Sequence, residues 1–116
     1  MTDKRIDADE IERAADAIPR LFRDSPLVRE TPLDEMLGCT LALKVETLNP
    51  IRSFKARGTE TLFSALAHRK PKAVIATSTG NFGQGSAWSA RQRGIAATIL
   101  VPEGANPLKL ASMRRL

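Results

Sequence analysis

Two short segments of the sequence contain residues whose types and spacing could do chemistry. The first is Ser53-Phe54-Lys55-Ala56-Arg57-Gly58, and the second is Thr77-Ser78-Thr79-Gly80-Asn81-Phe82-Gly83-Gln84-Gly85. A lysine amine attacks carbonyl groups and can hold a carbonyl compound as a Schiff base. A glycine-rich turn between a strand and a helix offers backbone N–H groups to a carboxylate or a phosphate. The first segment therefore suggests covalent catalysis, and the second suggests an anion site.

Lys55 is placed by its sequence in the first turn of a helix that Ser53 can cap. The start of a helix carries partial positive charge, so a lysine cation is disfavoured there and a neutral amine is favoured. The neighbouring Arg57 adds to this effect. A solvated lysine is the alternative, and it is far commoner than a catalytic one.

The second segment has two other interpretations. A glycine turn can be a tight connection between a strand and a helix, which is about as common as a binding site. A dinucleotide site is also conceivable, because Glu103 lies at a suitable distance to hold a ribose. However, Gly80, Gly83 and Gly85 follow the pattern G-x-x-G-x-G, whereas the dinucleotide fingerprint is G-x-G-x-x-G. The spacing argues against a dinucleotide.

Helices and strands alternate in the pattern that the residues predict. Asp7 and Glu10 resemble a capping box before a helix that Pro19 stops. The expected strands are 40–46, 73–77 and 96–101, and the expected helices are 9–18, 53–68, 87–93 and one from 107, with 79–85 as a turn. This order predicts an α/β fold with a parallel sheet covered by helices in three layers.

Composition indicates one globular domain over residues 1–116. Hydrophobic residues make up 42% of the chain and charged residues 27%, as in soluble proteins. The first residues lack the apolar stretch of a signal peptide, and the run 95–101 is far below the roughly 20 residues that cross a bilayer. The single cysteine, Cys39, is expected to be a buried, reduced thiol, which fits the cytoplasm. No metal site is predicted.

The net charge of +5 raises the question of nucleic acid. Arg69, Lys70 and Lys72 are best interpreted as a solvated turn around Pro71, and few aromatic side chains are present for base stacking. A nucleic-acid partner is therefore not expected. A parallel sheet of two or three strands would leave apolar edges unpaired, so we expect the chain to be a truncated fragment.

The two segments together resemble a known family. The stretch from Leu43-Lys44-Val45-Glu46 to Gly58 is similar to the pattern "LKxE…P…SFKxRG" of threonine dehydratases and serine racemases. Ser78 to Gly85 is similar to that family's "S-[ST]-G-N-x-x-Q-G". Thr31-Pro32-Leu33 and 109–115 also match the family layout. The chain therefore resembles the N-terminal part of a fold-type II, tryptophan synthase β-like, pyridoxal-phosphate enzyme of the threonine/serine dehydratase family.

The resemblance implies a cofactor, a reaction and a set of site residues. The cofactor is pyridoxal 5′-phosphate, and the reaction is β-elimination from L-threonine or L-serine to a 2-oxo acid and ammonia. Lys55 would hold the cofactor and remove the Cα proton, with Phe54 packed beside the cofactor and Asn81 bonded to its 3-hydroxyl oxygen. The substrate carboxylate would be gripped by a loop made of Ser78, Thr79, Gly80, Asn81 and Phe82. A homo-oligomer is expected of the full-length protein.

Two positions depart from the family pattern. Phe82 replaces a histidine of many dehydratases, and Thr79 replaces the serine that the racemases use as a second base, so racemisation is less expected. The family's phosphate loop and its serine or cysteine facing the pyridine nitrogen lie further along the chain, so an inactive fragment is conceivable. The alternatives are a β-replacement enzyme resembling cysteine synthase and a non-catalytic module that binds anions or nucleic acid.

Overall fold

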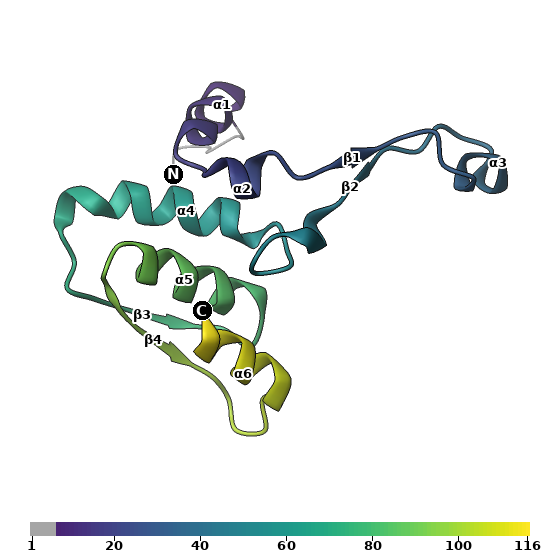
Figure 1. Ribbon diagram of the computed structural model, residues 1–116. Coiled ribbons are helices and arrows are strands. Elements are labelled where there is room, and N and C mark those ends of the chain that lie inside the picture. The colour runs from purple at the N-terminus through teal and green to yellow at the C-terminus, as the bar shows by residue number, and fades with distance from the viewer. Residues whose placement is uncertain (1–6) are drawn as a thin grey trace, which may run out of the picture.

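The computed structural model describes residues 7–116; the segment 2–6, which was part of the argument against a signal peptide, lies outside them. Helices and short strands alternate along the chain (Figure 1). The elements are α1 (Ala8–Asp16), α2 (Arg20–Arg23), β1 (Leu27–Val28), α3 (Leu33–Leu37), β2 (Leu43–Lys44), the 3-10 turn η1 (Glu46–Leu48), α4 (Lys55–Leu66), the 3-10 turn η2 (Ala67–Arg69), β3 (Ala73–Thr77), α5 (Asn81–Gln92), β4 (Ala96–Leu100) and α6 (Pro107–Arg115).

The first helix begins where its cap predicts. The Asp7 carboxylate accepts hydrogen bonds from the amides of Asp9 and Glu10 at 2.9 and 3.4 Å, so it satisfies two of the helix's free donors. The helix ends at Asp16, two residues earlier than predicted, and Pro19 begins the short α2.

The prediction of a long strand at 40–46 is wrong. Only Leu43 and Lys44 form a strand, which pairs antiparallel with Leu27 and Val28 and takes no part in the parallel sheet. The two strands form an arm that extends from the body with α3 at its tip (Figure 1). Cys39, which follows α3 on this arm, is exposed, so the prediction of a buried thiol is also wrong. On this arm the apolar residues next to Cys39 do not pack against the rest of the described chain.

The parallel sheet is made by β3 and β4, as predicted, in register from Ala73 opposite Ala96 to Thr77 opposite Leu100. Helix α5 connects the two strands and packs on them. Side chains alternate across a strand, so one face of β3 is half-buried and the other is exposed, with Ile75 73% accessible. Within residues 7–116, helices cover one face of this pair of strands.

The expected glycine turn at 79–85 is mostly helix, because α5 begins at Asn81. The glycines in it serve close packing. A Cβ at Gly83 would lie 3.0 Å from Met113 Sδ of α6, and one at Gly85 would lie 2.8 Å from Thr59 Oγ1 of α4. Glycine at both positions lets α5 approach its two neighbouring helices.

A small apolar core supports the start of α4. Phe22, Ile51 and Ala56 are fully buried, and Trp88 packs against Phe22 edge to face with ring centroids 5.6 Å apart. Ile51 and Ala56 flank Lys55 in sequence, so the core anchors the backbone on both sides of that lysine. In the part of the chain that the structure describes, no helix is both long and apolar enough to cross a bilayer, and no three potential metal ligands cluster.

Candidate functional site

Lys55 is the first residue of α4, as predicted, and its side chain is exposed. The predicted cap by Ser53 is wrong, because Phe54 occupies the N-cap position and no side chain caps the helix there; Ser53 Oγ only accepts from the Lys55 amide at 3.4 Å. The Lys55 amine nitrogen lies 4.9 Å from the centroid of the Phe54 ring, and that ring is 57% accessible. An amine and an aromatic face are therefore presented together to a ligand.

The loop before Lys55 is held by Asn49, which is buried. Its side-chain amide donates to the carbonyls of Glu46 and Ser53 at 2.9 and 3.0 Å, and its oxygen accepts from the amides of Ile51 and Ser53 at 3.1 and 3.4 Å. Sequence reasoning missed this role. The signal was an asparagine before a proline, which marks a turn closed by its own side chain.

The predicted anion loop lies between the carboxyl end of β3 and the start of α5. Ser78 Oγ accepts from the amides of Gly80 and Gly83 at 3.2 and 2.9 Å, so this hydroxyl shapes the turn. Among residues 7–116 the amides of Asn81 and Phe82 have no protein acceptor, and both residues are exposed. These two N–H groups and the positive end of the helix are available to an anion.

Helices α4 and α5 run in the same direction and begin at the same end of the molecule (Figure 1). Thr59 of α4 lies against Gly85 of α5, and Ser89 one turn further on donates to Glu60 Oε1 at 2.7 Å. One turn back from Thr59 is Lys55, and one turn back from Gly85 is Asn81. The pairing of the two helices therefore brings the cofactor lysine and the anion loop of the sequence prediction to one edge.

Lys109 is a further basic residue that sequence reasoning missed. A Cβ placed on Gly80 would lie 4.0 Å from Lys109 Nζ, so this amine reaches the anion loop. Asn106 accepts from the amide of Leu108 at 2.9 Å and starts α6, which puts Lys109 in its first turn. The signal was available, because β3 and β4 are parallel and the segments that follow them meet at the same sheet edge.

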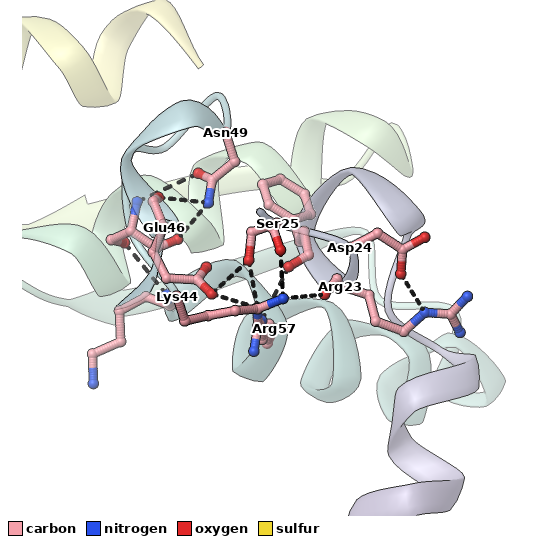
Figure 2. A network of polar contacts seen from close by, with 10 residues as sticks. Arg23, Asp24, Ser25, Lys44, Glu46, Asn49 and Arg57 are labelled. Carbon is pink, nitrogen blue, oxygen red and sulfur yellow. Dashed lines mark hydrogen bonds and ion pairs between the residues drawn. The ribbon is translucent and has the colours of Figure 1, made fainter. Parts of the chain in front are cut away.

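Arg57 is held by residues far earlier in the chain (Figure 2). Its guanidinium donates to the carbonyl of Phe22 and to Ser25 Oγ, both at 3.0 Å, and forms an ion pair with Glu46. The prediction that its charge acts on Lys55 therefore needs correction, because that charge is paired with a carboxylate.

The residues at this edge fit a pyridoxal group. They offer an exposed amine on Lys55, the ring of Phe54, a side-chain amide on Asn81, and free N–H groups for a carboxylate. Gly80 leaves open space beside them, since among residues 7–116, its chain neighbours aside, an added Cβ would meet just the Lys109 amine within 4 Å. Such a set can hold a carbonyl compound and an anion side by side.

Comparison with known proteins adds two relatives and a solved structure. Residues 18–116 match the family described as "Pyridoxal-phosphate dependent enzyme". The threonine synthase of Mycobacterium bovis is 46% identical over 81 residues, which are 69% of this chain and 22% of that protein. The mitochondrial threonine dehydratase of Schizosaccharomyces pombe is 37% identical over 97 residues, which are 83% of this chain and 16% of that protein.

The crystal structure of a threonine deaminase from T.th. superposes with a TM-score of 0.78 at 37% identity, covering 95% of this chain and 34% of that one. This match confirms the predicted fold class, that of the fold-type II pyridoxal-phosphate enzymes. The chain spans about a fifth of the two curated relatives and about a third of the solved structure. With the family match over residues 18–116, these likenesses establish that the chain belongs to the pyridoxal-phosphate-dependent enzymes, whose cofactor is pyridoxal 5′-phosphate.

Proposed function

We propose that this chain supplies the cofactor lysine and the substrate loop of an ammonia-lyase that deaminates L-threonine or L-serine by β-elimination. The observation that carries the proposal is the shared end of α4 and α5, where Lys55 and Asn81 begin two parallel helices. Relatedness to a threonine dehydratase and a threonine deaminase supports the reaction class.

Lys55 has the central part in the proposed reaction. Its amine would hold the cofactor, and as a free amine it would take the proton from Cα as a general base. Pyridoxal phosphate, when bound, stabilises the electron pair left at Cα. The β-hydroxyl leaves as water and a water is regained on hydrolysis, so L-threonine gives 2-oxobutanoate and ammonia in balance.

The loop of Ser78 to Phe82 orients the substrate in this proposal. The free amides of Asn81 and Phe82 donate to the carboxylate, and Lys109 adds a positive charge nearby. The Asn81 side chain would hold the cofactor through its 3-hydroxyl oxygen, and Phe54 would pack beside it. Ser78 contributes through the backbone turn that its hydroxyl closes.

A second candidate is an enzyme that forms threonine. The 46% identity with the threonine synthase of Mycobacterium bovis over 81 residues favours it. Both candidates use Lys55 and the same loop, so the difference between them lies in whether threonine is consumed or produced.

The test is to incubate the purified protein with pyridoxal phosphate and L-threonine or L-serine. Ammonia and the 2-oxo acid are quantified, and the remaining amino acid is resolved into its enantiomers. We expect 2-oxo acid and ammonia in equal amounts from the wild type, none from Lys55→Ala, and wild-type amounts from Lys72→Ala, which alters an exposed lysine before β3. Unconsumed threonine and serine would contradict an ammonia-lyase activity of this chain, and a D-enantiomer would indicate a racemase.

A further inference from the structure

We infer that Glu46, Asn49 and Arg57 are positioning residues for Lys55, which fix the backbone turn that presents its amine. The inference rests on the proposed role of Lys55 as the cofactor lysine. It concerns three side chains that hold the turn from the loop before the lysine and from the helix after it (Figure 2).

Arg57 lies two residues after Lys55, in the first turn of α4. Its Nε donates to the carbonyl of Phe22, and its Nη2 donates to Ser25 Oγ and to Glu46. A planar guanidinium with three acceptors in fixed directions allows little rotation. This one side chain therefore connects the start of α4 to α2 and to the segment that follows it.

Glu46 depends on Arg57 for its charge partner. Its side chain is 17% accessible, and its Oε1 also accepts from Ser25 Oγ at 2.8 Å. Its Oε2 is buried and has no hydrogen-bond partner in the described part of the chain. A carboxylate in this position is strongly destabilised when its single cation is removed. Glu46 and Arg57 consequently act as one unit.

Asn49 holds the other side of the turn. All four of its side-chain hydrogen bonds go to backbone groups of Glu46, Ile51 and Ser53, and Ser53 Oγ then accepts from the amide of Lys55. Within this loop Arg52 has a left-handed backbone with φ of 52°, which is uncommon for a residue other than glycine. Such a conformation persists only when its surroundings enforce it, as they do here.

A comparison within α4 separates positioning from general stabilisation. Glu60, one and a half turns after Lys55, is 2% accessible and pairs at 2.9 Å with Arg93, the residue that follows α5. This second ion pair holds the middle of the same helix. If the Arg57 unit only stabilised the fold, disturbing either pair would affect Lys55 alike.

The experiment measures how fast each lysine is labelled by pyridoxal phosphate. The purified protein and its variants Arg57→Lys, Asn49→Asp and Glu60→Gln are treated with the cofactor, reduced with borohydride at intervals, and mapped by peptide mass spectrometry. Labelling of Lys55 is compared with that of exposed Lys72 in the same sample, and the urea midpoint of each variant is recorded.

We expect Arg57→Lys and Asn49→Asp to slow labelling of Lys55 by about tenfold or more while Lys72 is unchanged, because small displacements of a reacting group cost large factors in rate. Glu60→Gln should lower the urea midpoint and leave the Lys55 rate within about twofold of the wild type. Labelling of Lys72 controls for differences in the reagent between samples, and Glu60→Gln controls for the effect of a lower folding stability.

Two results would overturn the inference. One is a wild-type labelling rate for Lys55 in Arg57→Lys and Asn49→Asp. The other is a loss of labelling that follows the urea midpoint across all three variants, including Glu60→Gln. A wild-type protein that labels Lys55 no faster than Lys72 would instead remove the proposed role of Lys55, and the inference with it.

Discussion

Thr59 of α4 lies directly against Gly85 of α5, with room for no atom between them. A Cβ on Gly85 would lie 2.8 Å from Thr59 Oγ1 and 3.0 Å from its Cγ2, and Thr59 is completely buried. Thr59 Oγ1 donates to the carbonyl of Ala56 at 3.2 Å and accepts from Ser89 Oγ at 3.0 Å, so the side chain is held where an added methyl group would lie. This contact sets the register between α4 and α5, whose first residues are Lys55 and Asn81.

Gly85→Ala tests this contact. The added methyl group should separate α4 from α5 and lower the free energy of unfolding by about 2 kcal/mol, as overpacking does. The matched control is Gly58→Ala, because a Cβ at Gly58 has no neighbour within 4 Å in the described part of the chain, and alanine favours a helix by about 1 kcal/mol. Urea unfolding measures the free energy of unfolding of both variants. Equal changes in the two variants would show that the contact of Thr59 with Gly85 does not limit how closely α4 and α5 pack.

Arg93→Met should cost about 3 kcal/mol of folding free energy, because it leaves the buried carboxylate of Glu60 without its cation. The double variant Glu60→Gln/Arg93→Met should recover part of this loss, since a neutral amide at position 60 no longer needs a charge partner. The measurement is a double-mutant cycle by urea unfolding. Additive losses in the cycle would contradict a direct coupling between the two side chains.

Asn81→Ala should weaken binding of pyridoxal phosphate by about tenfold, the value of one hydrogen bond to a polar ring substituent. Absorbance titration with the cofactor measures the affinity. Gln92→Ala is the control, because Gln92 is an exposed amide at the other end of the same helix. Unchanged affinity in Asn81→Ala would place the cofactor ring away from the start of α5.

Lys109→Ala should raise the KM for the amino acid by about tenfold with little change in kcat, because a charge that only attracts the carboxylate contributes to uniform binding. The effect should shrink as salt is added, since exposed charges are screened. Steady-state kinetics at two salt concentrations check this, and Lys109→Arg should keep most of the affinity. A fall in kcat alone would assign Lys109 a different task.

The local elements of the fold were predictable from sequence. Short patterns of apolar residues and caps predicted four features that the structure confirms. These are the strands 73–77 and 96–101, the position of Lys55 in a first helical turn and the start of α6 at Pro107. The glycine segment was misassigned because glycines usually end helices. Here Gly83 and Gly85 lie inside one, where the packing of neighbouring helices overrides propensity.

Contacts between distant residues could not be predicted. Nothing near Arg57 in the sequence indicates that it reaches Phe22 and Ser25. The exposure of Cys39 has the same origin. A thiol between leucines suggests burial, yet burial depends on whether the arm that carries it meets the rest of the chain.

Among residues 7–116, the groups that accept hydrogen bonds from the Arg57 guanidinium precede it in the chain, by 35, 32 and 11 residues. The ion-pair partner of Glu60, by contrast, is Arg93, which lies 33 residues later in the chain. A polypeptide leaves the ribosome from its N-terminus, so the groups that fasten the Lys55 turn are synthesised before α5 exists. The order of synthesis therefore allows the contacts that position Lys55 to form first. Helix α5 then packs against α4 after the start of α4 is stabilised.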